Sequence, residues 1–189
     1  DLFWGIKGGG GGSLGVVTRL TLQTHSLPEF FGAVFTTVKA QSDAAFRRLI
    51  GKVVSFYSEN LLNPHWGEQI GFRPGNVLAI AMVFQGLDQQ QAETFWRPFF
   101  DWLAASPKDF SILEPPRILA APARYFWDPG FLKKLPEIVL ADNRPGAPEA
   151  NVFWASNLEE AGQVLHGYQS AWLPASLLRV DEQQKLGDA

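Results

Sequence analysis

Five consecutive glycines, Gly8 to Gly12, restrict how this 189-residue chain can fold more than any other feature does. Each glycine loses more backbone freedom on folding than other residues do. A run of them is therefore kept where the chain needs positive φ angles or lies against something that leaves no room for a Cβ atom. Phe3 and Trp4 precede the run, and an alternating apolar and polar segment, residues 16–24, follows it. A flexible linker does not usually lie between an aromatic pair and a strand-like segment. We therefore expect a glycine loop that leads into a β-strand.

Known phosphate-binding loops fit this run poorly. Gly10, Gly12 and Gly15 satisfy the spacing G-x-G-x-x-G of a dinucleotide fingerprint, but that motif needs a strand before the loop and a helix after it. The order here is reversed, which excludes a Rossmann unit. A P-loop is excluded as well, because no Gly-Lys-Ser/Thr follows the run. Backbone amides in a glycine-rich turn can still form an anion nest, so contact with a phosphate group stays open.

The same segment resembles a known family of flavoproteins. Asp1-Leu2-Phe3-Trp4, the glycine block, a small polar residue and then Gly15-Val16-Val17-Thr18 are similar to the late part of the FAD-binding domain of FAD-linked oxidases. These are the vanillyl-alcohol-oxidase and berberine-bridge-enzyme-like flavoproteins. Gly5 stands where those proteins usually have alanine. His25-Ser26-Leu27-Pro28 is similar to the point where their chain crosses into the substrate-binding domain.

The resemblance implies two partial domains and a cofactor. Residues 1–27 would be the C-terminal end of an FAD-binding domain, and residues 28–189 a substrate-binding domain that is itself truncated. An N-terminal FAD subdomain would be missing, so we expect this fragment alone to be inactive. The full-length protein would be an FAD-dependent oxidoreductase that moves a hydride from an alcohol, amine or sugar-like small molecule to the flavin. The residues whose backbone would face the flavin are Gly10, Gly11, Gly12, Ser13, Gly15, Val16 and Val17.

The amino-acid composition excludes several classes of protein and several kinds of cofactor site. With 46% hydrophobic residues and 15 Phe, 7 Trp and 3 Tyr, the chain can build an ordered core. The absence of cysteine excludes disulfides, iron–sulfur clusters, thiolate zinc sites and a cysteinyl flavin bond within it. Neither the net charge of −3 nor the scattered basic residues favour a nucleic-acid partner. No apolar stretch approaches the length of a membrane span and no signal-peptide pattern opens the chain, so we expect a cytoplasmic location.

The apolar pattern predicts strands and helices in alternation. The fold class expected is α+β, with an antiparallel sheet covered by helices on one face and preceded by the glycine loop and strand of the incomplete FAD-binding domain. Strands are predicted at 16–24, 30–39, 68–72, 77–85, 112–121 and 151–156. Helices are predicted after Ser42 or Asp43, after Asp88 with a kink or restart at Pro98, and over 158–172 after a cap at Asn157. Pro115 and Pro116 would push the strand at 112–121 to a sheet edge.

The sequence offers few candidates for catalytic or metal-binding side chains. The three histidines, His25, His65 and His166, lack metal-ligand spacing and an evident orienting partner, so we predict no metal site. Aromatic residues are the best candidates for a substrate surface, although ordinary core packing explains them as well. Tyr125 is the leading catalytic candidate, because a tyrosine can exchange a proton with a substrate and its neighbours are polar. The aromatic set comprises Tyr125, Phe126, Trp127, Trp154 and Tyr168.

A second reading from another class stays open. The chain could be a non-catalytic α+β module that binds a partner or dimerises through exposed aromatics, with a purely structural glycine loop. A truncated substrate domain would, in contrast, expose the sheet face and edge that it normally packs against its partner, and we therefore predict self-association.

Overall fold

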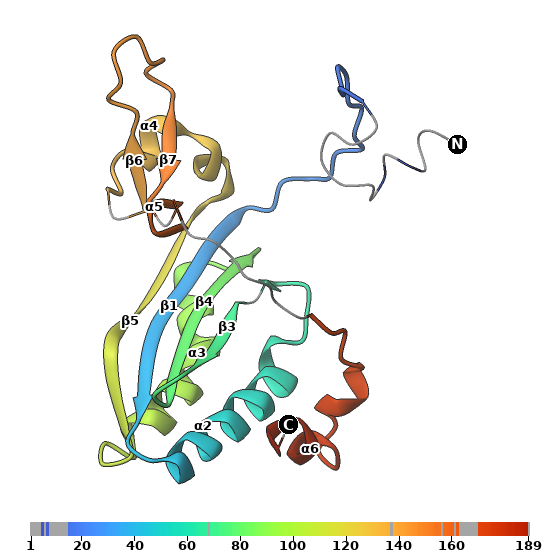
Figure 1. Cartoon of the computed structure of the whole chain (residues 1–189), viewed down its shortest axis with the longest axis vertical. Helices are drawn as coiled ribbons and strands as arrows, with labels where there is room; N and C mark the ends of the chain where they lie inside the picture. The colour runs from blue at the N-terminus through green and yellow to red at the C-terminus, as the bar shows by residue number, and fades with distance from the viewer. Residues whose placement is uncertain are drawn as a thin grey trace.

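A five-stranded antiparallel sheet with two long helices forms the body of the protein (Figure 1). A smaller lobe with a two-stranded sheet lies at one end of it. The predicted α+β class is therefore confirmed. The structure, a computed structural model, describes Gly5, Lys7 and residues 15–67, 69–136, 138–155, 157–160, 162 and 170–188.

The main sheet has the strand order β2-β4-β1-β5, and β3 also pairs with β4. All of its pairings are antiparallel. β1 lies at the centre, with Phe35 opposite Ala81 of β4 and Arg117 of β5. The prediction of a hairpin and of an edge strand with two prolines is confirmed, because β3 pairs with β4 and β5 lies at the edge. The strands are β1 (Phe30–Ala40), β2 (Trp66–Gly67), β3 (Ile70–Arg73), β4 (Val77–Gln85) and β5 (Phe110–Pro122).

Two helices cover one face of this sheet. α2 (Asp43–Phe56) begins after Ser42, whose hydroxyl accepts a hydrogen bond from the backbone of Ala45. α3 (Gln89–Ala104) begins after Asp88, which forms a reciprocal capping box with Gln91. Both starts were predicted. The buried sides of both helices join alternate residues of β1 and β4 in a single core, so the helices lie on the same face.

The centre of the core is aromatic. The Trp96 ring lies 5.1 Å from that of Phe56, 5.8 Å from that of Phe99 and 6.1 Å from that of Trp66. Phe84 on β4 is also buried and lies 5.2 Å from Trp66, measured between ring centroids. The aromatic composition therefore serves mainly to fill the space between the helices and the sheet.

Gly32 on β1 is required by this packing. A Cβ atom on it would lie 2.0 Å from Cζ of Phe84 and 2.3 Å from the carbonyl oxygen of Leu119. Phe84 is the cross-strand partner of Gly32, so the phenyl ring lies directly over the glycine. This close approach is a common reason for glycine in a strand interior.

The other side of the main sheet, which we call the outer face, lacks a covering helix among the described residues. Alternate side chains of β1, β4 and β5 point to it, and three large ones are well exposed: Phe35 (37%), Val83 (49%) and Leu119 (37%). Ala33 joins Val83 and Leu119 in register across the three strands. The predicted exposure of a sheet face thus agrees with the structure.

The edge formed by β5 is more protected than predicted. The side chain of Gln89 donates from Nε2 to the carbonyl oxygen of Ile118 (2.7 Å) and accepts from the backbone N–H of Ala120 (2.9 Å). It thereby satisfies two of the backbone groups that another strand would pair with. Pro115 and Pro116 lack the N–H groups that such a strand would need as well.

Three secondary-structure predictions need correction. Residues 16–24 are an exposed, extended segment and not a strand, because none of the described residues pairs with them. α3 passes through Pro98 as one uninterrupted helix. The predicted helix over 158–172 is represented by α5 (Asn157–Glu160), and Trp172 is fully exposed outside any helix. Residues 161 and 163–169 of that prediction lie outside the described residues.

Two short units complete the chain. The small lobe follows β5, and its two strands pair with each other in an antiparallel manner. The C-terminal segment returns to α2 and to the turn that follows it, where the hydroxyl of Ser58 donates to the carbonyl oxygen of Leu178 (2.9 Å) (Figure 1). The lobe contains η2 (Ala123–Trp127), α4 (Pro129–Leu132), β6 (Val139–Ala141) and β7 (Val152–Trp154). The C-terminal segment contains η3 (Ala175–Leu178) and α6 (Gln183–Asp188), and a π-helical turn, η1 (Tyr57–Leu61), extends α2.

Candidate functional site

The predicted flavin-facing segment is only partly described. Gly10, Gly11, Gly12 and Ser13 lie outside the described residues. Gly15 has a φ of +147°, a backbone conformation that favours glycine, and nothing lies within 4 Å of a Cβ placed on it. Val16 and Val17 are exposed, at 91% and 60%.

The described part of this region, which begins at Gly15, extends away from the sheet, and Val16, Val17, Leu20 and Leu22 are exposed (Figure 1). It fits the resemblance insofar as it presents backbone groups and apolar side chains, which suit an apolar ring and a backbone-lined loop. Among the residues that can be placed, 15–28 offer Arg19 and His25 as the side chains able to carry positive charge. The described part of the chain therefore fits one wall of a flavin site better than a complete phosphate cradle.

Tyr125 is held within the small lobe. Its ring stacks on Phe131 at 4.8 Å with an interplanar angle of 13°, and Nη2 of Arg124 donates to its hydroxyl oxygen (3.1 Å). This hydrogen bond raises the pKa of the Arg124 guanidinium above its usual value. Tyr125 is thus already paired with a cation and an aromatic ring of its own lobe.

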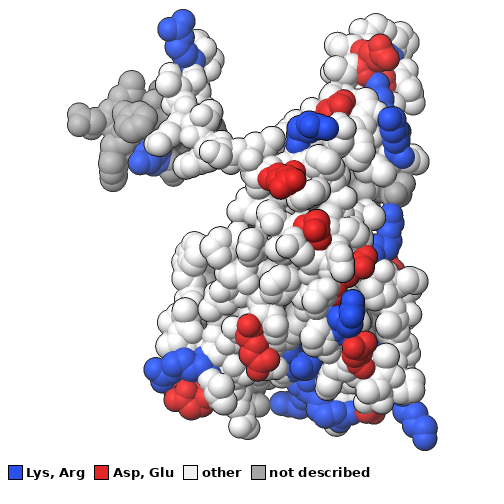
Figure 2. Space-filling view, turned by 180° about the vertical axis from the view of Figure 1, so that it is seen from behind, with Lys and Arg blue, Asp and Glu red and all other residues white. Residues whose placement is uncertain are grey.

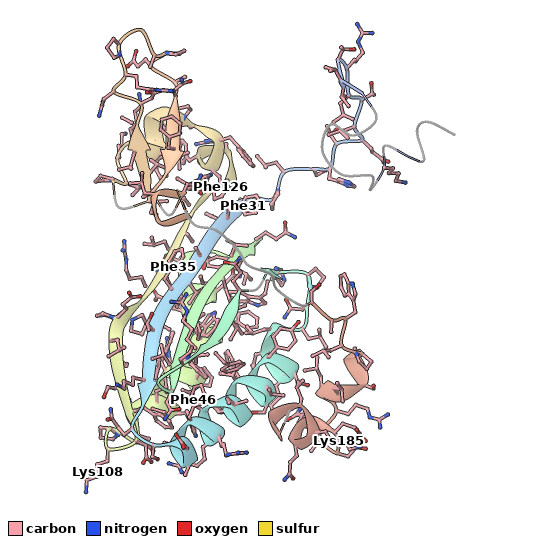
Figure 3. All side chains as sticks on the ribbon, viewed as in Figure 1. Phe31, Phe35, Phe46, Lys108, Phe126 and Lys185 are labelled. Carbon is pink, nitrogen blue, oxygen red and sulfur yellow. The ribbon has the colours of Figure 1, made fainter. Side chains whose placement is uncertain are left out.

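The other aromatic candidates are brought together around Phe126. Its ring lies 5.2 Å from that of Trp127 and 5.7 Å from that of Trp154. Phe31 of β1 lies 5.6 Å away on the other side, so the cluster connects the lobe to the main sheet (Figure 3). Trp127 remains 72% exposed. Tyr168, the last of the predicted set, lies outside the described residues.

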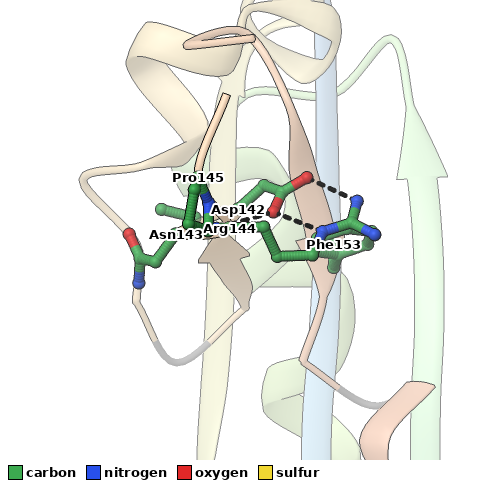
Figure 4. A pocket seen from close by; sticks show the side chains of 6 residues that line it. Asp142, Asn143, Arg144, Pro145 and Phe153 are labelled. Atoms are coloured by element: carbon green, nitrogen blue, oxygen red, sulfur yellow. Dashed lines mark hydrogen bonds and ion pairs between the residues drawn. The ribbon is translucent and has the colours of Figure 1, made fainter. Parts of the chain in front are cut away.

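A hollow in the small lobe lies beside Asp142, Arg144 and Phe153 (Figure 4). Asp142 accepts hydrogen bonds from Nε (2.8 Å) and Nη2 (2.7 Å) of Arg144 and from Nδ2 of Asn151 (3.2 Å). The Arg144 hydrogen bonds hold the pKa of the Asp142 carboxyl well below its usual range. Arg144 also lies over the Phe153 ring, 5.6 Å from its centroid. These bonds secure the turn between β6 and β7, so a structural role accounts for the carboxylate.

Two of the three histidines, His25 and His65, can be described. Nδ1 of His65 lies 2.9 Å from the carbonyl oxygen of Gln85, His25 is exposed, and His166 lies outside the described residues. No group of three or more metal-ligating side chains occurs in the part of the chain that can be described. Basic and acidic side chains are interspersed over the surface seen in Figure 2. Of the helices that can be described, none is long and apolar enough to cross a membrane.

One polar arrangement on the outer face was not anticipated. The hydroxyl of Thr37 on β1 donates to Oε2 of Glu114 on β5 (2.8 Å), and the buried hydroxyl of Thr36 donates to the backbone carbonyl of Glu114 (2.8 Å). The register between β1 and β5 shifts here, between Phe35 and Thr37. Pro115 and Pro116 follow Glu114 directly and cause the shift, because neither can donate to the ladder.

The alternation of β1 and the proline pair were visible in the sequence, but the pairing of Thr37 with Glu114 was not. Thr36 and Thr37 point to opposite sides of the sheet, and each contacts a different part of Glu114. Backbone and carboxylate are thus both fixed by β1, and the carboxylate lies on the outer face.

Comparison with known proteins finds a relative in sequence. The chain is 27% identical over 119 residues to an uncharacterised FAD-linked oxidoreductase of Arthroderma benhamiae. The match covers 57% of this chain and 20% of the relative, so the chain spans about a fifth of the length of that protein. No family model matches the chain.

Two solved structures show partial likeness. A VAO-type flavoprotein from Myceliophthora thermophila superposes with a TM-score of 0.48 and 22% identity, covering 67% of this chain and 23% of that one. MupZ from Pseudomonas fluorescens superposes with a TM-score of 0.36 and 13% identity, covering 61% and 81%. The sequence match to an FAD-linked oxidoreductase confirms the resemblance predicted from the glycine segment.

Proposed function

We propose that this chain is part of an FAD-dependent oxidoreductase that transfers a hydride from an alcohol, amine or sugar-like substrate to the flavin. Residues 28–189 would form the substrate-binding domain, and residues 1–27 the end of the FAD-binding domain. The observation that carries the proposal is the 119-residue match to an FAD-linked oxidoreductase. Because the match covers a fifth of that relative, an N-terminal FAD subdomain would complete the site.

The geometry supports the outer face as the substrate-facing wall. Helices cover the opposite face, and the outer face presents Phe35, Val83 and Leu119 to solvent. An apolar surface of this kind can bind an apolar substrate, because binding removes the surfaces of both the sheet and the substrate from water. These three side chains would bind the substrate, orient it and exclude water from it.

The flavin, when bound, supplies the hydride acceptor. Backbone groups of Gly10, Gly11, Gly12, Ser13, Gly15, Val16 and Val17 would hold it. In the full-length protein, Gly12→Val should reduce FAD retention more than Ser13→Ala, because a close-approach loop is blocked by a side chain but not by loss of a hydroxyl. Equal retention by the two variants would contradict a close-approach loop.

Tyr125 is the weaker proposed contact of the substrate. Its hydroxyl already pairs with Arg124. In the active full-length protein, Tyr125→Phe should leave flavin binding unchanged and lower turnover only if the phenol exchanges a proton with the substrate. Equal turnover would remove Tyr125 from the site.

The first experiment is an absorption spectrum of the full-length protein from its native source. Flavin bands near about 370 and 450 nm would support the oxidoreductase. A colourless protein that takes up no added FAD would contradict it and favour the non-catalytic α+β binding or dimerisation module. The fragment by itself should be inactive in either case.

Self-association of the fragment is a related proposal. The outer face would be covered in the complete protein, so the isolated fragment should associate through it. We expect light scattering to give a mass above that of the monomer, and Val83→Ser to shift the mass towards the monomer. Leu62→Ser, at an exposed leucine (54%) outside the strands of the sheet, is the matched control and should change nothing. A monomer at high concentration would argue against association.

A further inference from the structure

The outer face carries one acidic side chain, Glu114, which is held by hydrogen bonds from β1. The three longest strands of the sheet, β1, β4 and β5, contain a single acidic residue, Glu114. It lies in the middle of β5, opposite Thr37. In ligand sites, a few placed polar groups fix the orientation of a mostly apolar ligand, and a carboxylate beside exposed apolar side chains can do the same.

The position of Glu114 is fixed from two sides. The buried hydroxyl of Thr36 donates to its backbone carbonyl, and the hydroxyl of Thr37 donates to Oε2, both at 2.8 Å. A hydrogen bond to a carboxylate from a β-branched residue in the central strand restricts the rotamer of the glutamate. The carboxylate is therefore ordered before any ligand arrives, which lowers the entropy lost on binding.

The chemistry of a carboxylate selects the ligand. It only accepts hydrogen bonds, at about four positions on its two oxygens, and Thr37 occupies one of them. A ligand must therefore bring a donor. Lys39 lies on the same face, opposite Ser111 and two residues along β1 from Thr37, and its charge opposes the approach of a cation. A neutral hydroxyl fits both conditions, because it donates without adding positive charge.

We propose that Glu114 accepts a hydrogen bond from the hydroxyl group of an otherwise apolar ligand bound on the outer face. The inference deepens the proposed function, since that ligand would be the substrate, and it rests on the proposed function in that respect only. Hydroxyl recognition itself can be measured without flavin chemistry.

Three matched probes test the proposal: phenethyl alcohol, its methyl ether and phenethylamine. Their dissociation constants would be measured on the full-length protein by ligand-detected NMR. We expect the alcohol to bind roughly tenfold more tightly than the ether, as a hydrogen bond to a charged acceptor implies. Equal affinities, or an amine that binds more tightly than the alcohol through Glu114, would overturn the proposal.

Variants of the protein test whether Glu114 causes the preference for the alcohol over the ether. Glu114→Ala should bring the ratio of ether to alcohol dissociation constants to about one, and Thr37→Val should lower it partway. Thr37→Val also serves where Glu114→Ala does not fold, as judged by circular dichroism. Glu93→Ala on α3 is the matched control, an exposed glutamate on another element, and should leave the ratio unchanged. An unchanged ratio in folded Glu114→Ala would overturn the assignment.

The proposed oxidoreductase function and the proposed hydroxyl site can be refuted independently of each other. Flavin content is read from the absorption spectrum of the same preparation. A protein without flavin that still discriminates the alcohol through Glu114 would contradict the oxidoreductase and support the hydroxyl site. A flavoprotein without discrimination would support the oxidoreductase and overturn the hydroxyl site.

Discussion

Replacing Gly32 with alanine should destabilise the protein strongly. The added Cβ would lie 2.0 Å from Cζ and 2.5 Å from Cε2 of Phe84, and 2.3 Å from the backbone oxygen of Leu119. Carbon atoms pack best at about 3.5 to 4.0 Å, so something must move by more than about 1 Å. Neither neighbour can do so easily, because Phe84 is buried against Trp66 and Leu119 belongs to a paired strand.

Overpacking of a well-filled core costs about 1 to 3 kcal/mol and occasionally more. With backbone on one side and a buried ring on the other, we expect a loss of about 3 kcal/mol for Gly32→Ala, the upper end of that range. For a protein of this size that corresponds to a fall of about 6 to 12 °C in Tm. Urea unfolding followed by tryptophan fluorescence would measure it as a lower midpoint with an unchanged slope.

Gly51→Ala is the matched control. Gly51 is an exposed residue inside α2, and nothing lies within 4 Å of a Cβ placed on it. Alanine should raise the free energy of unfolding there by about 1 kcal/mol, because it restricts the unfolded chain and favours helix. A Gly32→Ala protein within about 0.5 kcal/mol of the wild type would refute the packing of Phe84 over Gly32.

Three further predictions concern the surface. Asp88→Ala should lower the free energy of unfolding by about 1 kcal/mol, measured in urea, because it removes the capping box of α3. Gln89→Ala should expose the edge of β5 and increase aggregation, measured by light scattering on heating; an unchanged onset would show that the prolines protect the edge alone. The third concerns pH: Arg144 lowers the pKa of Asp142 in the folded state, so the contribution of this carboxylate to stability is present above about pH 4 and is lost as the pH falls further. Hydrogen-exchange protection factors, which are corrected for the intrinsic pH dependence of exchange, should therefore fall in residues 142–151 on acidification, and Asp142→Asn should give low protection at both pH values.

Local patterns predicted the elements of the body well. The Ser42 and Asp88 caps, the turn before β4 and the edge position of the two-proline strand were all readable, because each depends on neighbours within a few residues. Residues 16–24 have the apolar and polar alternation of a strand. A strand also needs a neighbouring strand with which to form backbone hydrogen bonds, and its own sequence does not provide one. Without a partner among the described residues, the segment is extended and exposed.

For the candidate site too, some features could be predicted from the sequence and others depend on the tertiary structure. The sequence by itself determined the resemblance to FAD-linked oxidases, which was first recognised from the order of residues in one short segment, and the presence of an amphipathic sheet with helices on one side. Only the tertiary structure decided which side chains meet. It turned Tyr125 towards Phe131, and it brought Thr37 to Glu114, 77 residues further along the chain. The physical reason is register: a one-residue shift moves a strand's side chains to the opposite face, and here a proline pair sets that shift.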